Sequence, residues 1–275
     1  MKVVVITGST RGLGYGLADA LLDQDCAVSI SGRTAAAVRE AVSTLSEKYG
    51  ADRVFGSACD VADFQQVQSL WDVTSAHFGK IDFWINNAGL GHPPANFWHL
   101  SPDLVKEVVS VNLIGAMYGS IVAVQGMINQ GFGSLYNMEG RGSNGSRTAG
   151  LALYGSTKYG LRYLIRSLVQ EARDTPIIIG ALSPGMVVTD LLTGQFEGRP
   201  EAWDQAKRIF NILADPVETV APWLAGKILA NRKSGVRFAW LSRTRLLWRF
   251  ISAPFSNRDL LSGQDSPVGG GSAGA

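Results

Sequence analysis

Residues 7–14 read Thr7-Gly8-Ser9-Thr10-Arg11-Gly12-Leu13-Gly14 and follow a short run of β-branched residues at 2–7. Glycines here let the backbone turn tightly and approach a pyrophosphate, whose charge is favoured by the amino end of the helix that follows. Beyond the turn, the spacing of Leu13, Leu17 and Leu21 gives that helix one apolar face. The stretch therefore predicts the strand, phosphate-binding turn and helix of a dinucleotide-binding fold.

The rest of the chain alternates β-branched runs with amphipathic stretches of helical length. We expect strands near 2–7, 26–31, 53–58, 81–86, 132–138, 176–182 and 236–241, with helices between them. This alternation predicts an α/β fold, a Rossmann-type doubly wound parallel sheet of about seven strands in a single domain. We expect the catalytic domain to span 1–252 and a tail to span 253–275, whose last ten residues are Gly/Ser/Ala-rich and expected to be disordered.

Composition and charge exclude several kinds of function. A formal net charge of +2 gives no large field for a polyanion, so we expect no nucleic-acid partner. The two cysteines, Cys26 and Cys59, are expected to be buried thiols in a reducing, cytoplasmic compartment. A strand that begins at residue 2 leaves no room for a signal peptide, and we expect no membrane-spanning helix. The three histidines share no ligand spacing, so no metal site is predicted.

The second predicted strand ends in Ser31-Gly32-Arg33, where an NAD-binding protein places an acidic residue for the ribose hydroxyls. A guanidinium at that position pairs bidentately with a 2′-phosphate, and Arg11 lies on the same side. NADPH is therefore favoured over NADH. The alternative is a pair of solvated arginines at two helix starts.

Two further segments are expected to border the cofactor. Asp60-Val61 follows the third predicted strand and could contact the adenine, although Asp60 could also cap the next helix. Asn86-Asn87-Ala88-Gly89 ends the fourth predicted strand at the same edge of the sheet, with Asn87, Ala88 and Gly89 expected to border the cofactor.

Tyr154-Gly-Ser-Thr-Lys158 opens the helix expected after the fifth strand. A spacing of four residues puts the phenol and the ammonium on one face of that helix. Because a nearby cation stabilises phenolate, we expect Lys158 to lower the pKa of Tyr154 toward the operating pH for general acid or base catalysis. A Tyr/Lys pair at this spacing is common on surface helices. It indicates a catalytic site only where the same chain also supplies the cofactor-binding turns in the right order.

Together these motifs resemble the short-chain dehydrogenase/reductases from about residue 2 to 241. The resemblance rests on the Thr-Gly-x-x-x-Gly-x-Gly turn, Asn-Asn-Ala-Gly, Asn112 in Val-Asn-Leu-Ile-Gly, Tyr-x-x-x-Lys, and Pro184-Gly185 followed by Thr189. It implies that Tyr154 protonates a carbonyl oxygen and that Lys158 holds the nicotinamide ribose and tunes Tyr154. It also implies that Asn112 positions a water in a proton relay, and that Pro184, Gly185 and Thr189 border the nicotinamide and its phosphates.

The chain departs from this family after the fifth predicted strand. Where the family shows Asn-x-Ser-Ser, this chain reads Asn137-Met138-Glu139-Gly140, so the hydroxyl that hydrogen-bonds the substrate carbonyl is missing. We expect Ser143 to replace it, with Ser146 as the other candidate and turn geometry as the alternative role of either serine. Glu139 is a poorer substitute, because an ionised carboxylate would repel a developing alkoxide.

At and beyond this departure the sequence resembles the chlorophyll(ide) b reductases, a narrower group within the same family. The similarity covers roughly 134–224. It implies NADPH-dependent reduction of the C7 formyl group of chlorophyll(ide) b to hydroxymethyl. A hydrophobic pigment needs a wide cleft, which the glycine-rich loop 140–150 and the substrate-side excursion 189–216 would border. Aromatic walls could come from Phe97, Trp98, Phe196, Trp203 and Phe210, or these side chains could instead pack a lid.

Residues 237–255 mix cations with large apolar groups. This segment could contact an anionic surface at a photosynthetic membrane, or it could be buried against a neighbouring subunit. The family resemblance implies a homodimer or homotetramer formed by helices near 101–128 and 151–173.

Two other functions stay open at this stage. One is a short-chain reductase of another bulky carbonyl, such as a steroid, a quinone or a polyketide. The other is a catalytically silent NADPH-binding sensor, which the missing serine would allow.

Overall fold

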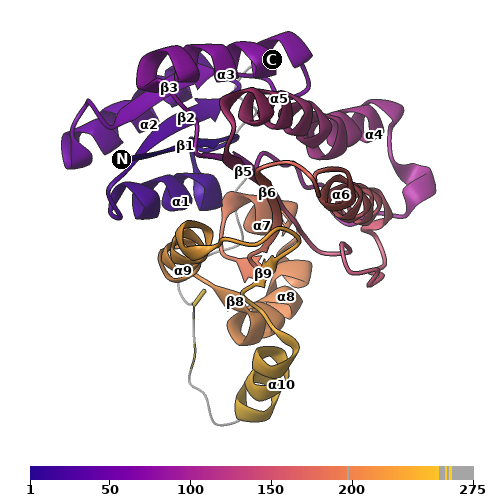
Figure 1. Ribbon diagram of the computed structural model, residues 1–275. Coiled ribbons are helices and arrows are strands. Elements are labelled where there is room, and N and C mark those ends of the chain that lie inside the picture. Colours follow the sequence, from indigo (N-terminus) through magenta and orange to yellow (C-terminus); the bar gives the residue numbers. More distant parts are fainter. Residues whose placement is uncertain (197, 254–257, 259, 262–275) are drawn as a thin grey trace.

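The computed structural model of the chain describes residues 1–196, 198–253, 258 and 260–261. Its centre is a parallel seven-stranded sheet with the strand order β3-β2-β1-β4-β5-β6-β9 (Figure 1). The strands are β1 (Lys2–Ile6), β2 (Cys26–Gly32), β3 (Val54–Ala58), β4 (Phe83–Asn86), β5 (Gly133–Met138), β6 (Ile177–Ser183) and β9 (Arg237–Ala239). The strand order changes direction at β1 and β4, as in Rossmann-type sheets, so the predicted fold class is confirmed.

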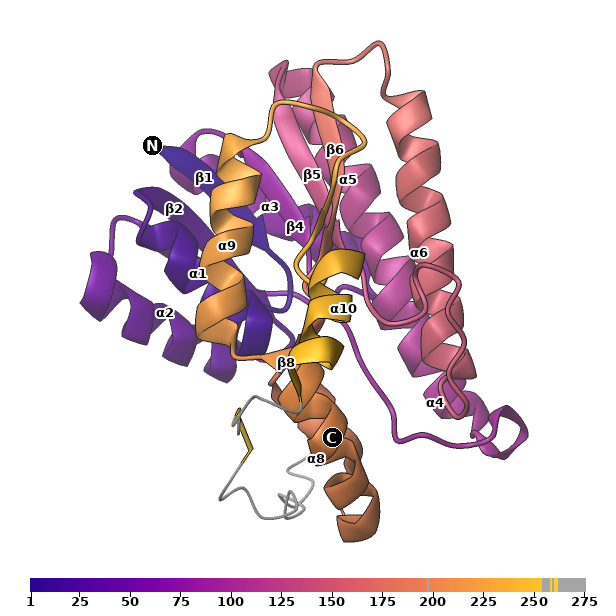
Figure 2. The same cartoon turned by 90° about the horizontal axis from the view of Figure 1, so that it is seen from below.

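Helices cover both faces of this sheet (Figures 1 and 2). One layer contains α1 (Gly12–Leu22), α2 (Ala35–Tyr49) and α9 (Val217–Ala230), and the other contains α3 (Phe64–Phe78), α5 (Gly115–Gln130) and α6 (Ala152–Glu171). Each layer closes over its own apolar core, the first around Leu17 and Leu224 and the second around Trp71 and Leu161. With both faces covered, the carboxyl edge of the sheet is where a ligand can reach the strand ends.

A continuous helix of 29 residues runs from 102 to 130, through α4 (Pro102–Val109), the π-helical turn η2 (Ser110–Ile114) and α5. By length and composition alone it could cross a membrane, so the sequence expectation of no such helix was wrong on that criterion. Half of its most apolar window is buried inside the protein, and α5 packs on α3 and β5. Its hydropathy is therefore that of a core helix.

The excursion after β6 forms a small structural unit. It contains the two-stranded pairing of β7 (Met186–Val187) with β8 (Ala214–Asp215), and the helical segments α7 (Asp190–Thr193), η3 (Gly194–Phe196) and α8 (Pro200–Leu213). The strands of this pair are too short to carry a sequence signal, and they were not predicted.

The helix α10 (Arg243–Ser252) lies with α8 beyond the layered body (Figures 1 and 2). The buried carboxylate of Asp215 anchors it, accepting hydrogen bonds from Arg249 Nη2 at 2.7 and 2.9 Å, from Trp240 Nε1 at 2.6 Å and from Arg258. The ten residues expected to be disordered, 266–275, lie outside the described residues.

Candidate active site

The phosphate-binding turn has the backbone that its glycines predict. Gly8 and Gly12 have φ angles of 63° and 58°, which side chains rarely tolerate. Arg11 is the N-cap of α1 and makes no side-chain cap hydrogen bond, so within the described structure no cap side chain occupies the amino end of α1. Free N–H groups at a helix start bind anions, so this turn fits the pyrophosphate of a dinucleotide.

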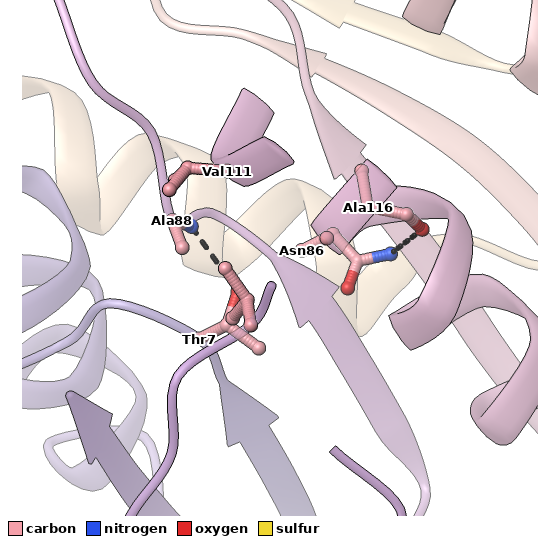
Figure 3. Close-up of a pocket in the computed structure, with 7 residues that line it drawn as sticks. Thr7, Asn86, Ala88, Val111 and Ala116 are labelled. Atoms are coloured by element: carbon pink, nitrogen blue, oxygen red, sulfur yellow. Dashed lines mark hydrogen bonds between the residues drawn. The ribbon is translucent and has the colours of Figure 1, made fainter. Parts of the chain in front are cut away.

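A pair of loops is locked together at the ends of β1 and β4. Thr7 Oγ1 accepts hydrogen bonds from the backbone N–H groups of Asn87 and Ala88, at 3.0 and 3.1 Å, and Figure 3 shows the second of these. In return, Asn87 Nδ2 donates to the carbonyls of Thr7 and Gly8, each at 2.9 Å. The Asn-Asn-Ala-Gly segment therefore lies directly against the phosphate turn, as predicted.

Asn86 is a structural residue of the site, to which the sequence analysis gave no role beyond its place in the Asn-Asn-Ala-Gly motif. Its Nδ2 donates to the Ala116 carbonyl at 3.1 Å and to Asn137 Oδ1 at 2.9 Å, which joins β4 to α5 and β5. Asn86 and Ala116 both line the small hollow in Figure 3. The indole of Trp84 donates to Asn86 Oδ1 at 2.8 Å. The only sequence signal was the first Asn of Asn-Asn, which gives no hint of these distant partners.

The two candidate phosphate-binding arginines are both exposed and only weakly paired. Arg33 Nη1 lies 3.6 Å from Glu107 Oε1, and Arg11 Nη1 lies 3.7 Å from Asp190 Oδ2. All four side chains are more than half exposed, so these contacts hold the guanidiniums only loosely. An incoming phosphate could displace either carboxylate.

Asp60 does not cap the helix that follows it, so that alternative was wrong. Its Oδ1 accepts a hydrogen bond from Ala62 N at 2.9 Å, within the turn after β3. The N-cap of α3 is Asp63, which accepts from Gln65 N and Gln66 N. Val61 is buried against Gly115. The hydrogen bond of Asp60 and the burial of Val61 thus hold the turn at 60–61 at the carboxyl edge of the sheet, where the cofactor is expected to bind.

Tyr154 and Lys158 lie on one face of α6, as their spacing predicts. Lys158 Nζ is 5.7 Å from the Tyr154 ring centroid and donates to the Met138 carbonyl at the end of β5, at 3.2 Å. A Cβ built at Gly89 would lie 3.7 Å from Lys158 Nζ and 3.4 Å from Asn112 Oδ1. The structure therefore brings Tyr154, Lys158, Asn112 and Gly89 together.

The pKa shifts of this pair differ from the sequence expectation. Burial raises the pKa of Tyr154 to about 12, whereas we expected Lys158 to lower it. The same burial lowers the pKa of Lys158 to about 8, against an opposing effect of Glu139. Desolvation outweighs the attraction between phenolate and ammonium, so the phenol keeps its proton at neutral pH, as a general acid must.

Asn112 lies in the π-helical turn between α4 and α5 and is buried. Its Oδ1 accepts from Leu90 N at 2.7 Å, and its Nδ2 donates to the Leu90 carbonyl at 2.8 Å and to Thr157 Oγ1 at 3.4 Å. Single π turns often occur at functional sites. Here the turn directs an amide that fixes the segment after Gly89 against α6.

Gly140 occupies the place of the missing serine, directly beside Tyr154. A Cβ on Gly140 would lie 2.3 Å from the Tyr154 hydroxyl and 3.3 Å from Lys158 Cε. Ser143, the predicted replacement, is buried, and its Oγ is 3.4 Å from Glu139 Oε2. Ser146 is exposed, which leaves Ser143 as the loop serine that is enclosed with the site.

The segment after β6 faces the phosphate turn. Gly185 has a φ of 77°, and a Cβ on Gly12 would lie 3.5 Å from Thr189 Cγ2. Together with the Arg11–Asp190 contact, this places Thr189 across from the amino end of α1. A dinucleotide bound on the turn would be bordered by this segment.

The aromatic side chains divide into two groups. Phe196, Trp203 and Phe210 pack on one another with ring centroids 5.6 to 6.1 Å apart, and Trp203 and Phe210 are buried. These three fill the core of the excursion, so lid packing was the correct alternative for them. Phe97 and Trp98, in the short 3₁₀ helix η1 (Phe97–His99), are exposed.

Neither cysteine belongs to the site. Cys26 and Cys59 are buried free thiols, as expected, and burial raises their pKa to about 11 and about 12. In the part of the chain that the structure describes, no three His, Cys, Asp or Glu side chains gather as metal ligands would.

Residues 2–200 match the family model described as short chain dehydrogenase. The chain belongs to the short-chain dehydrogenase family. It is 35% identical over 269 residues to the probable chlorophyll(ide) b reductase NYC1 of Oryza sativa subsp. japonica, which covers 91% of this chain and 52% of that protein. It is 37% identical over 243 residues to the chlorophyll(ide) b reductase NOL of Arabidopsis thaliana, which covers 84% of this chain and 66% of that protein. The chain thus spans about half to two thirds of these chloroplast relatives.

Solved structures share the fold at low identity. Serine dehydrogenase complexed with NADP+ has a TM-score of 0.75 at 22% identity, covering 86% of this chain and 93% of that one. A 3-ketoacyl-(acyl-carrier-protein) reductase from Brucella melitensis complexed with NADH has a TM-score of 0.76 at 23% identity, covering 87% and 96%. Both likenesses show the fold.

The first prediction concerns Gly140. Restoring the usual serine there, by Gly140→Ser, should lower turnover of a carbonyl substrate about 100-fold, because the new Cβ must displace the Tyr154 hydroxyl. Affinity for NADPH, measured by fluorescence titration, should change little. Arg147→Ser, at an exposed position of the same loop, is the control and should keep full turnover. Turnover of Gly140→Ser at or above the wild-type rate would contradict this geometry.

Proposed function

We propose that this protein is an NADPH-dependent reductase that converts the C7 formyl group of chlorophyll(ide) b to hydroxymethyl. The observation that carries this proposal is the extent of the similarity to chlorophyll(ide) b reductases. The family model ends at residue 200, whereas the match to the rice relative covers 91% of the chain. The similarity must therefore continue into the segments that follow residue 200, where substrate-side elements lie.

The proposed mechanism assigns one role to each residue of the buried cluster. When bound, NADPH supplies a hydride for the formyl carbon. Tyr154 donates its phenolic proton to the formyl oxygen, and the raised pKa of Tyr154 keeps that proton available. Lys158 hydrogen-bonds the nicotinamide ribose and stabilises the phenolate left on Tyr154. Asn112 holds the proton relay in place, and Ser143 provides the second hydrogen bond to the carbonyl when its hydroxyl turns from Glu139 Oε2 to the substrate.

Position 140 favours an aldehyde on a bulky substrate. The absence of a side chain on Gly140 lets the Tyr154 hydroxyl lie beside the backbone at the end of β5. The exposed Phe97 and Trp98 could contact a flat ring system at the carboxyl edge of the sheet. A different bulky carbonyl is the alternative substrate.

A direct assay of chlorophyllide b with NADPH tests the activity. The wild-type protein should shift the absorption of the pigment to that of the 7-hydroxymethyl product, and Tyr154→Phe should reduce kcat by about 10²- to 10⁴-fold with NADPH binding unchanged. Tyr159→Phe, one turn further on the exposed face of α6, is the matched control and should keep full activity.

Two results of this assay would count against the proposal. If the wild-type protein left the pigment unchanged but reduced steroid, quinone or polyketide carbonyls, the substrate assignment would be wrong. If the wild-type protein bound NADPH and reduced none of these compounds, it would be a catalytically silent NADPH-binding sensor.

The preference for NADPH is proposed from Arg33. Its guanidinium follows β2 and has only a loose acidic neighbour, and the end of β2 bears no carboxylate for ribose hydroxyls. Arg33→Ala should raise the KM for NADPH about 10- to 100-fold and change the KM for NADH little, because only NADPH carries the 2′-phosphate. Arg39→Ala, on α2, serves as the control for a general change of surface charge. An equal loss with both cofactors would contradict this role.

Contact with a membrane is proposed through α10. This helix has three arginines and no acidic residue, and Leu247, Trp248, Phe250 and Ile251 are each more than half exposed. Apolar groups next to cations are typical of helices that lie on anionic lipid surfaces. Such contact at a photosynthetic membrane would bring the enzyme to a lipid-soluble pigment, and the relatives are chloroplast proteins by name.

Co-sedimentation with vesicles tests this surface. The wild-type protein should pellet with vesicles that contain anionic lipids, and Leu247→Ser combined with Trp248→Ser should reduce the pelleted fraction several-fold. Binding that is equal with and without anionic lipid, or no binding at all, would contradict the proposal. In the latter case a smaller oligomer in the variant would identify α10 as a subunit contact.

Assembly is proposed through the helices α5 and α6. Tyr163 on α6 and Ile121 on α5 are large apolar side chains that this chain leaves exposed. The family resemblance implies that these helices pair between subunits as a homodimer or homotetramer. Burial of these side chains in such a contact would remove apolar surface from water.

A further inference from the structure

Glu139 is a buried carboxylate next to the catalytic pair, at the place where the family has the first serine of Ser-Ser. Its side chain is 1% exposed. Its Oε2 accepts a hydrogen bond from Arg237 Nε at 2.5 Å and lies 3.4 Å from Ser143 Oγ, and its Oε1 lies 3.9 Å from Arg162 Nε. A carboxylate this deeply buried stays charged only where cations and donors compensate for lost water.

The groups around Glu139 come from separate elements. Arg162 is on α6, one turn after Lys158, and Arg237 is on β9, where its Nη2 also donates to Ser183 Oγ at 2.7 Å. Ser143 belongs to the loop that follows β5. Lys158 Nζ donates to the carbonyl of Met138, the residue before Glu139, and a Cβ on Gly140, the residue after it, would lie 3.3 Å from Lys158 Cε, so Glu139 lies in the segment that Lys158 contacts. One carboxylate thus lies among three cations.

We infer that Glu139 is a positioning residue of this active site, which keeps Lys158 charged and holds Ser143 in the loop beside Tyr154. It acts through these two side chains. The inference rests on the proposed function to the extent that Lys158 must be an ammonium to bind ribose and stabilise the Tyr154 phenolate.

Electrostatics gives the sign of this effect. Burial alone disfavours the ammonium of Lys158 and lowers its pKa, and the negative charge of Glu139 raises it again. The arginines weaken the field of Glu139 without cancelling it. The family has serine at this position. Because serine is neutral, it would not raise the pKa of Lys158 against the effect of burial.

The arginines also answer the objection that a carboxylate would repel a developing alkoxide. Arg237 on β9 forms a short ion pair with Glu139 Oε2, and Arg162 on α6 lies near Glu139 Oε1. Both carboxylate oxygens therefore face cations. The residue adjacent to the Tyr154 hydroxyl is Gly140. The carboxylate can therefore act on Lys158 without being the nearest group to the substrate oxygen.

The test is the titration of Lys158 in protein labelled with [13C]lysine, followed by the NMR shift of its Cε and assigned with Lys158→Arg. In the wild type the midpoint should lie near pH 8. Glu139→Gln should move it down by about one pH unit, because the opposing charge is gone. Arg237→Gln should move it up, because the field of Glu139 is then less compensated.

The pH dependence of kcat should shift in the same direction as the titration midpoint of Lys158. With chlorophyllide b and NADPH, the kcat of the wild type should fall as pH rises through about 8, since the charged form of Lys158 is present below its pKa. In Glu139→Gln the kcat should fall at a pH about one unit lower than in the wild type. An assay at a pH about one unit more acidic should therefore recover most of the wild-type kcat. Glu139→Asp, which keeps the charge, should hold the fall near its wild-type position.

Asp215→Asn is the matched control, because it also removes a buried carboxylate with two arginine partners, in β8 and far along the chain from Glu139. It should lower the unfolding temperature and leave the Lys158 midpoint unchanged. An unchanged midpoint in Glu139→Gln and in Arg237→Gln would overturn the inference. If Glu139→Gln does not fold, the upward shift in Arg237→Gln decides. Midpoints that shift as expected in a protein that reduces no pigment would uphold the role of Glu139 and refute the proposed substrate.

Discussion

A lysine ammonium buried beside a neutral phenol is the constraint on which the rest of the site depends. Lys158 has left water, and its compensation comes from the Met138 carbonyl at 3.2 Å and from the field of Glu139. Both groups belong to the carboxyl end of β5 or follow it directly. A displacement of α6 against β5 would therefore leave a buried charge without partners, which is far more costly than the loss of an exposed ion pair.

The doubly wound sheet is what holds α6 and β5 in that relation. Parallel strands bring all their carboxyl ends to one edge, so segments as far apart as Thr7, Asn87 and Glu139 reach a single site. Arg237 joins them because the amino end of the short β9 pairs with Ala181, near the carboxyl end of β6. Side-chain hydrogen bonds then lock neighbouring loops, as Thr7 does for the Asn-Asn-Ala-Gly segment and Asn112 does for Leu90. The phosphate turn and the Tyr154–Lys158 pair are thereby fixed relative to each other before any ligand binds.

Most of the fold could be predicted because its signals are local. Most of the seven strands are short apolar or β-branched runs, and all seven were placed within two residues of their observed ends. The approach of Tyr154 to Lys158 follows from helical spacing alone. The pairing of β7 with β8 was missed, because two residues show no periodicity and the pairing spans the whole excursion.

The electrostatics of the site could not be predicted in this way. Glu139 and Arg237 are 98 positions apart, so nothing near Glu139 in the sequence reveals the cation that compensates its charge. The contact of Gly140 with the Tyr154 hydroxyl, and the burial that raises the pKa of that phenol, likewise arise only when β5 and α6 pack. Motifs identify which side chains react, whereas their protonation depends on neighbours that only the fold supplies.

Hydride transfer is tested most directly with NADPH that carries deuterium at both C4 positions of the nicotinamide and with chlorophyllide b, by mass spectrometry and NMR of the product. We expect one deuterium on the new hydroxymethyl carbon at C7, with the hydroxyl proton taken from Tyr154 and ultimately from solvent. A 7-hydroxymethyl product without deuterium, or a pigment left unreduced while the cofactor is bound, would contradict it.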